Sequence, residues 1–258
     1  MLQMQIRVNP GHIAPGWICY DAEAMLQIGT ITRSFLSVSV ILCGSLASQA
    51  ATLPTAAEIV ERMMVHNQEQ DRALLGYRTQ RKFFAANARF KLDSTMVVQT
   101  VFRTPDSMES SIVSHVGSDL IKLHVFDEIL KAEGETHKKE DKQRVDITPR
   151  NYDFSVAGED TCDGRPCYRV IVTPKRKDKY SVKGDVWIDA EDYAIVRVHG
   201  APAKKPSFFT LKTEIDKRYR KINGIWLTDR FDSWSDVFIG GHSTLSIEYQ
   251  YEAVQTAP

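Results

Sequence analysis

Residues 89–102 read RFKLDSTMVVQTVF, and polar and apolar side chains alternate along this stretch. Its apolar face comprises Phe90, Leu92, Met96, Val98 and Phe102. The opposite face comprises Arg89, Lys91, Asp93 and Gln99. Alternation with a period of two is typical of an antiparallel strand with one buried face and one wet face. The stretch therefore predicts a long strand at the surface of a β-rich domain.

Similar patterns recur along the rest of the chain and predict a β meander. Further strands are expected at residues 77–85, 108–115, 151–159, 167–174, 180–189, 193–199, 207–220, 225–235 and 243–253. Turn-forming pairs such as Asp163-Gly164, Asn223-Gly224 and Gly240-Gly241 stand at the junctions. So many strands with two helices predict an α+β fold that is mainly β, in which a single curved antiparallel sheet forms an incomplete barrel with a helical lid.

Two segments switch to helical spacing. Thr55-Ala-Ala-Glu58 is a capping-box pattern, and the apolar residues after it predict an amphipathic helix over 55–74 that ends at Gly76. A second helix is expected over 118–133, where seven of the eleven residues from Leu120 to Leu130 are apolar. A helix that is apolar on nearly every side must be sandwiched or must cover something. The charged run 133–144 predicts a solvated loop.

The N-terminal 50 residues resemble an extension joined to a signal sequence. Arg33 precedes the apolar run 35–47, and Ser48-Gln49-Ala50 fits the small-x-small rule for signal peptidase. We expect the true start at Met25, cleavage after Ala50, and one domain over residues 51–258. Two alternatives are a membrane anchor, for which the run is short of the roughly 20 residues needed, and a lipidated Cys43, which follows Leu42 instead of a small residue.

Two cysteines, Cys162 and Cys167, lie in the expected mature chain and flank Asp163-Gly164. A disulfide across this hairpin would suit an oxidising compartment. The alternatives are two free thiols or half of a metal site, but the sequence has no second cysteine pair or nearby histidine cluster that would complete a zinc site. We therefore predict a disulfide and no metal.

Charge and motifs exclude several classes of function. The 33 basic residues are balanced by 33 acidic residues, which gives no electrostatic argument for nucleic acid or for an anionic membrane surface. The sequence has no nucleophile elbow, zinc-protease motif, phosphate loop or dinucleotide fingerprint. The missing motifs predict a protein that is not an enzyme. We also expect it to need no cofactor and to be a monomer. A site assembled from distant positions, as in a hydrolase, is the less favoured alternative.

One run of residues resembles a known family. It comprises Cys167-Tyr168-Arg169-Val170, Thr173-Pro174-Lys175, Tyr180, Gly184-Asp185-Val186-Trp187-Ile188-Asp189, Asp192-Tyr193-Ala194-Ile195-Val196-Arg197 and Gly224-Ile225-Trp226-Leu227. The run resembles outer-membrane lipoprotein-sorting proteins of the LolA/LolB-like lipoprotein-carrier superfamily, over residues 55–253. That resemblance implies an incomplete barrel with a helical lid over an apolar cavity, a periplasmic location, and acyl chains of a lipoprotein or lipid as ligand.

The resemblance also implies which side chains line the cavity. We expect them to be Phe90, Leu92, Met96, Val98, Phe102, Leu123, Phe126, Phe209, Leu211, Ile215 and Tyr219. The alternative is that these residues form an ordinary core under a packing helix. Carriers of this family latch the lid with an arginine, and neither Arg81 nor Arg89 stands in a motif that selects it for this role.

Two roles fit this resemblance. The first is a carrier that holds an acyl chain and exchanges it with an inner-membrane transporter. The second is an envelope-stress-type sensor that docks an inner-membrane regulator. A basic docking patch and a second domain would favour the sensor, whereas the balanced charge and the length favour the carrier.

Overall fold

The computed structural model describes residues 53–105, 107–136, 146–177, 180–204, 210–238 and 240–257. The predicted extension and signal sequence at residues 1–50 lie outside this part of the chain, and so does Phe209. None of the helices in the described ranges is both long enough and apolar enough to cross a bilayer.

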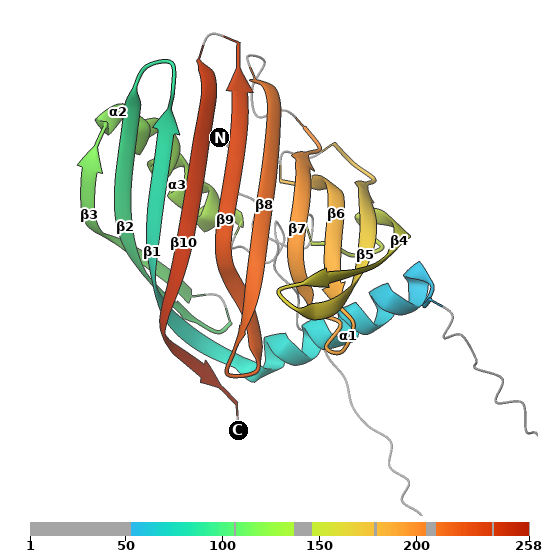
Figure 1. Ribbon diagram of the computed structural model, residues 1–258. Coiled ribbons are helices and arrows are strands. Elements are labelled where there is room, and N and C mark those ends of the chain that lie inside the picture. The colour runs from blue at the N-terminus through green and yellow to red at the C-terminus, as the bar shows by residue number, and fades with distance from the viewer. Residues whose placement is uncertain are drawn as a thin grey trace, which may run out of the picture. The chain divides into compact units, whose positions relative to one another are not determined.

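A single antiparallel sheet of ten strands forms most of the domain, in the order β3-β2-β1-β10-β9-β8-β7-β6-β5-β4 (Figure 1). The strands are β1 (Leu74–Asn87), β2 (Leu92–Arg103), β3 (Ser107–Gly117), β4 (Tyr152–Cys162), β5 (Arg165–Pro174), β6 (Val182–Asp189), β7 (Ile195–Pro202), β8 (Thr210–Ile222), β9 (Ile225–Val237) and β10 (Gly241–Thr256). In the described residues the sheet does not close, and β3 and β4 are its edges. The predicted fold class is confirmed.

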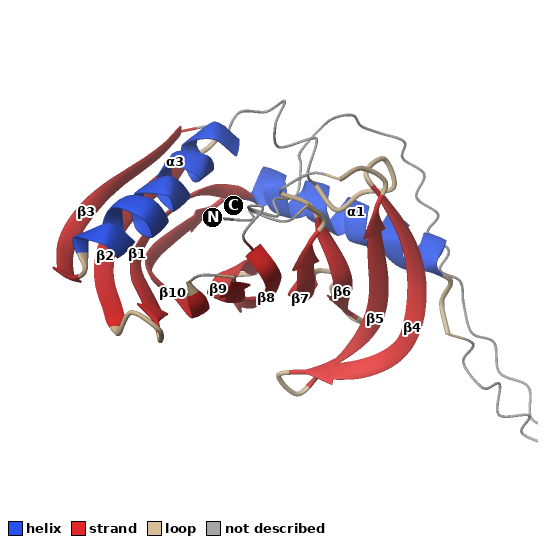
Figure 2. Ribbon diagram, turned by 90° about the horizontal axis from the view of Figure 1, so that it is seen from above, coloured by secondary structure: helices blue, strands red, loops and turns tan. Residues whose placement is uncertain are grey.

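The sheet is strongly curved, and the helices lie on its concave side (Figure 2). Helix α1 (Ala56–Ala73) crosses the half that contains β4 to β7. A second helical segment lies over β1 to β3. It consists of α2 (Asp119–Ile121), η1 (Lys122–Phe126) and α3 (Asp127–Thr136). Each helix therefore covers a different half of the sheet.

Helix α1 begins as the sequence predicts and ends earlier. The Thr55 hydroxyl accepts a hydrogen bond from the Glu58 backbone, and the Glu58 carboxylate accepts one from the Thr55 backbone. The helix ends at Ala73 and the chain continues directly into β1, so the expectation that Gly76 ends it is wrong. Gly76 instead lies inside β1, where a Cβ atom would stand 2.6 Å from the Phe102 carbonyl oxygen. The close approach of β2 therefore requires a glycine.

The second helical segment contains a π turn over Lys122–Phe126. Its buried residues are Ile121, Phe126, Ile129 and Glu133. The step of five residues from Ile121 to Phe126 matches the wider π turn, and the later steps match an α-helix. This change of spacing leaves Leu120 and Leu123 exposed. The predicted segment is one continuous helical stretch, but its apolar residues do not all share in the packing.

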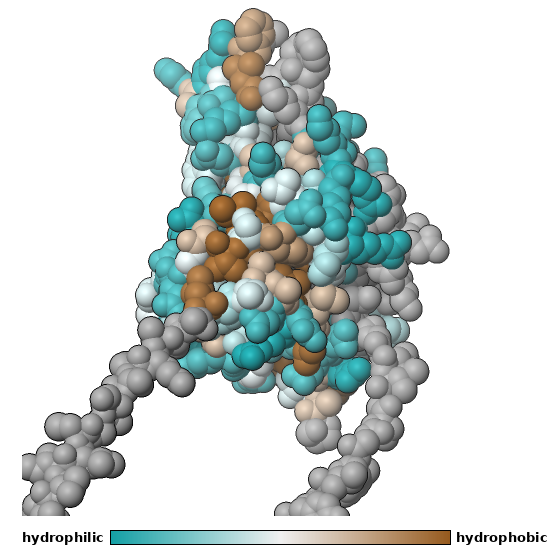
Figure 3. Space-filling view, turned by 90° about the vertical axis from the view of Figure 1, so that its right-hand side faces the viewer, coloured by the Kyte–Doolittle hydropathy of each residue, from teal (hydrophilic) through white to brown (hydrophobic). Residues whose placement is uncertain are grey.

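The core lies between the helices and the concave face. Its largest fully buried side chains are Tyr152, Phe83, Phe126, Phe231, Ile59, Met63, Met96, Ile129, Ile188, Ile215 and Ile247. A second cluster of Cys167, Trp187, Ala194, Val196 and Trp226 packs separately. Figure 3 shows that hydrophobic residues gather in one area of the face it presents, with hydrophilic residues around it.

A buried ion pair attaches α3 to the sheet. Arg81 of β1 points inward, and its Nη1 donates a hydrogen bond to Glu133 Oε1 over 2.5 Å. The two side chains are 3% and 1% exposed. Arg81 also donates to the Ser110 hydroxyl of β3 and lies over the rings of Phe83 and Tyr249. Burial alone would lower the pKa of Arg81, but the Glu133 carboxylate outweighs this and raises it.

This pair corrects the expected solvated loop at Glu133 and shows which of Arg81 and Arg89 contacts the helical segment. Glu133 does not begin a solvated loop, because α3 continues through it and turns it toward Arg81. Arg81 rather than Arg89 is the arginine that contacts the helical segment. Arg89 lies in the β1–β2 turn, beside Gly241.

The predicted disulfide is absent, since Cys162 and Cys167 are both free thiols. The hairpin itself forms as expected around Asp163-Gly164. Its register places Cys162 opposite Arg165 and Cys167 opposite Asp160, so the cysteines are diagonal neighbours. Diagonal neighbours lie about 7–8 Å apart, which is beyond the ~7 Å between Cα atoms that a disulfide bridges. A hydrogen bond between the thiols raises the pKa of Cys162 and lowers that of Cys167.

Removing the cation of the buried pair should destabilise the domain strongly. We expect Arg81→Met to lower the free energy of unfolding by about 3–5 kcal/mol, because a buried carboxylate would lose its cationic partner. Arg78→Met is the matched control, since Arg78 of β1 also pairs with a carboxylate, that of Glu252, but is 56% exposed. It should cost at most about 1 kcal/mol. Denaturant unfolding measures both, and equal losses would contradict the role of Arg81.

Candidate ligand-binding pocket

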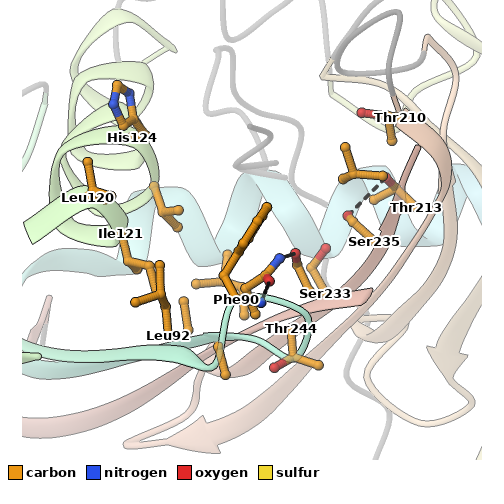
Figure 4. Close-up of a pocket in the computed structure, with 17 residues that line it drawn as sticks. Phe90, Leu92, Leu120, Ile121, His124, Thr210, Thr213, Ser233, Ser235 and Thr244 are labelled. Carbon is orange, nitrogen blue, oxygen red and sulfur yellow. Dashed lines mark hydrogen bonds between the residues drawn. The ribbon is translucent and has the colours of Figure 1, made fainter. Parts of the chain in front are cut away.

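A pocket of about 460 Å³ lies between the start of the second helical segment and the concave face of the sheet (Figure 4). Its walls come from β1, the β1–β2 turn, β2, α2, η1, β8, β9 and β10.

One wall of the pocket is apolar. It comprises Phe90, Leu92, Leu120, Ile121, Val125 and Leu245. Phe90 belongs to the β1–β2 turn and not to β2 as predicted, because β2 begins only at Leu92. The turn holds Phe90 in place: its backbone N–H donates to Asn87 Oδ1 over 2.9 Å, and the next residue, Lys91, adopts a left-handed conformation with φ of 51°. Leu120 and Ile121 approach from the helical segment (Figure 4).

The facing wall carries a polar row, by which we mean Thr213, Ser235, Ser243 and Asn87. The sheet register places Thr213 opposite Ser235, Ser235 opposite Ser243, and Ser243 opposite Asn87. The row thus crosses β8, β9, β10 and β1 at one level. Thr213 and Ser235 share a hydrogen bond of 3.0 Å, and Asn87 Nδ2 donates to the Ser243 hydroxyl over 2.8 Å. Thr210, Ser233 and Thr244 add further hydroxyls to the lining.

Along three strands, the inward-facing residues change from apolar to hydroxyl-bearing at the polar row. On β8 the inward residues change from Ile215 to Thr213, on β9 from Phe231 to Ser233 and Ser235, and on β10 from Leu245 to Ser243. Because the period of a strand is two, these residues all face the same side as the core. The floor of the concave face is therefore apolar below the pocket and lined with hydroxyls within it.

Electrostatically the pocket is almost neutral. None of its lining residues in the described ranges is Asp, Glu, Lys or Arg, and His124 is the one histidine among them. Figure 4 shows His124 on the helical segment, on the opposite side of the pocket from Thr213 and Ser235. No group of three or more His, Cys, Asp or Glu able to hold a metal occurs in the described part of the chain. The pocket can therefore offer apolar contact and uncharged hydrogen bonds.

The predicted cavity residues do not all lie together. Phe90 and Leu92 line the pocket. Buried core positions, each at most 4% exposed, hold Met96, Val98, Phe102, Phe126 and Ile215. Leu123 and Leu211 are exposed by 57% and 55%, and Tyr219 is partly buried against both hydrophobic clusters. Phe209 lies outside the described residues.

Sequence reasoning did not find the polar row. The expected cavity residues are all apolar or aromatic, so no residue of the row is among them. A usable signal was present, because Ser233, Ser235 and Ser243 are in phase with the inward residues Phe231 and Leu245 of their own strands. The pairing between strands, which brings the hydroxyls to one level, is not visible in the sequence.

The chain is similar to a protein-family model and to several solved structures. A protein-family model described as an uncharacterized protein matches residues 133–255. No curated protein sequence matches the chain. A solved structure of a putative outer membrane lipoprotein-sorting protein domain from Vibrio parahaemolyticus is 10% identical, with 78% of this chain and 93% of that chain covered and a TM-score of 0.40.

Two further solved structures are similar. A DUF1329 family protein from Desulfovibrio piger is 14% identical, with 76% of this chain and 91% of that chain covered and a TM-score of 0.38. A LolA superfamily protein from Nitrosomonas europaea is 9% identical, with 80% and 95% covered and a TM-score of 0.35. These matches include the superfamily that the sequence resembles.

The free energies of unfolding of two alanine variants test whether Phe126 is part of the core and Leu123 is not. Phe126 is fully buried and packs edge-on against Phe83, with ring centroids 5.7 Å apart. We expect Phe126→Ala to lower the free energy of unfolding by about 3–5 kcal/mol, and Leu123→Ala, on the exposed side, to change it by less than about 0.5 kcal/mol. Urea unfolding followed by tryptophan fluorescence measures both. A small loss for Phe126→Ala would show that its ring faces a cavity.

Proposed function

We propose that this protein binds the acyl chain of a lipid or lipoprotein in the pocket beneath the second helical segment and carries it through the periplasm. The observation that supports this proposal is the pocket, whose volume of about 460 Å³ falls in the range of roughly 300–1,000 Å³ of ligand sites. Its apolar wall offers the contact that an acyl chain needs.

The energetics suit a carrier that releases its ligand. Burial of an acyl chain contributes about 0.8 kcal/mol per methylene, so a few methylenes against the apolar wall give measurable affinity. Leu120 of the helical segment is 62% exposed although it borders the pocket. A chain that enters the pocket would cover this side chain, and the gain in burial would favour the bound state.

The proposed location rests on the sequence. The predicted signal at residues 25–50 would direct the domain out of the cytoplasm, and the family that the sequence resembles works in the periplasm. Export would bring the pocket to the compartment in which lipoproteins and lipids travel between two membranes. An inner-membrane transporter is then the expected source of the ligand.

Two leucines of the helical segment provide a matched test. Leu120 borders the pocket and is 62% exposed, whereas Leu123, one turn away, is 57% exposed and does not border it. We expect Leu120→Ala to weaken binding of the uncharged fluorophore N-phenylnaphthylamine about three- to tenfold, because it removes apolar contact with the ligand. Leu123→Ala should bind as the wild type does.

Fluorescence titration of the purified domain measures these affinities, and thermal unfolding confirms that both variants are folded. Either of two results would refute the proposed site: the wild type does not bind the fluorophore, or the two variants weaken its binding equally.

A further inference from the structure

The polar row suggests which class of lipid the pocket selects. We propose that the pocket prefers an uncharged amphiphile whose polar part carries hydroxyl and ester oxygens, as in an acylglycerol, over an anionic lipid such as a free fatty acid. This inference rests on the proposed function, because it concerns the head group of a ligand whose acyl chain occupies the same pocket.

The first step of the argument is the cost of placing a row of hydroxyls on an inward face. A hydroxyl that is removed from water without a partner costs about 1–3 kcal/mol in proteins. Thr213 and Ser233 are only 8% and 9% exposed, whereas valine or alanine would need no hydrogen-bond partner at either position. Hydroxyls on several strands at the same pocket therefore indicate a polar ligand group at this level.

The second step is the hydrogen-bonding capacity that the row retains. Each hydroxyl can donate one hydrogen bond and accept two. Asn87 donates to the Ser243 hydroxyl, which uses an acceptor site of Ser243 and leaves its O–H able to donate into the pocket. In the Thr213–Ser235 pair one hydroxyl donates to the other, so the accepting partner keeps its own proton for a ligand. Ester and hydroxyl oxygens of a lipid are suitable acceptors for these donors.

The third step is the absence of compensating charge. A carboxylate or phosphate that leaves water needs a cationic partner, because burial of an unpaired charge is far more costly than burial of a hydroxyl. No lysine or arginine borders the pocket within the described residues. His124 is the single histidine of that lining, and it lies across the pocket from the row (Figure 4). The walls therefore favour a neutral head group.

The two walls also fix the orientation of the ligand. In Figure 4 Leu92, Leu120 and Ile121 lie at one end of the pocket, and Thr210, Thr213 and Ser235 lie at the other. An acyl chain would extend along the β1–β2 end under the helical segment. The oxygen-bearing group would then contact β8 and β9.

The test compares monolauroylglycerol with laurate, which share one acyl chain, as competitors of N-phenylnaphthylamine at pH 8 and below their micelle concentrations. Laurate is ionised at this pH. We expect the wild type to bind monolauroylglycerol at least about tenfold more tightly than laurate. Each lost hydrogen bond weakens binding about two- to tenfold, so Thr213→Val combined with Ser235→Ala should remove most of this preference and leave laurate binding unchanged.

Thr100→Val is the matched control. Thr100 is 2% exposed and shares a 3.0 Å hydrogen bond with the Ser110 hydroxyl, as Thr213 does with Ser235, but it does not border the pocket. Its substitution should change neither affinity.

Three outcomes separate this inference from the proposed function. Tighter or equal binding of laurate by the wild type would overturn the inference while leaving an acyl-chain carrier in place. An equal loss of both ligands in the Thr213/Ser235 variant would also overturn it. Failure of the fluorophore and of both lipids to bind would instead refute the proposed function.

Discussion

Strand β1 hydrogen-bonds to strand β10 along its whole length, from Leu74 opposite Thr256 to Asn87 opposite Ser243. This pairing joins the first three strands to the seven that follow, since β3 and β2 attach to the sheet only through β1. The pocket depends on it directly. Without this ladder Asn87 and Ala85 would not lie beside Ser243 and Leu245, and the β1–β2 turn would not place Phe90 near β9 and β10.

The buried Arg81–Glu133 pair also positions the pocket, because it holds the helical segment over strands that the β1–β10 pairing joins to the sheet. A buried ion pair is weak evidence for net stability, since the removal of two charges from water costs about as much as their attraction returns. Its geometry is specific, however. The pair fixes α3 at one position on β1, and the π turn between α3 and α2 then sets which side chains of the segment face the pocket.

The sequence was informative where a single segment determines its own structure. Alternation in residues 89–102 predicted the faces of β2, and the Thr55–Glu58 capping box predicted the start of α1. The fold class followed from the number and spacing of such segments. The ends of helices and strands were less predictable. Gly76 resembled a helix stop, but its lack of a side chain allows the close approach of Phe102 from another strand. A contact between two strands cannot be read from the segment around Gly76 alone.

The pocket was harder to predict than the sheet for a physical reason. An unbroken α-helix over 118–133 would place Leu123 and Phe126, three residues apart, on one face, and the family resemblance implies that both line a cavity. The π turn changes the steps, so Phe126 enters the core and Leu120 and Ile121 border the pocket. The polar row was invisible for a similar reason, because the level shared by Thr213, Ser235 and Ser243 depends on the register of three strands.

The two walls of the pocket come from separate parts of the chain. Nearly all of the apolar wall lies within residues 85–125, and the hydroxyls lie within residues 210–244. Changes in one segment can therefore alter contact with the proposed acyl chain while most of the hydrogen bonds proposed for its head group are retained, and the reverse also holds. Two residues cross this division, because Asn87 of β1 belongs to the polar row and Leu245 of β10 belongs to the apolar wall. The β1–β10 ladder brings both to the pocket by pairing Asn87 with Ser243 and Ala85 with Leu245. For the proposed ligand, affinity and head-group selectivity are therefore largely distinct properties of one pocket.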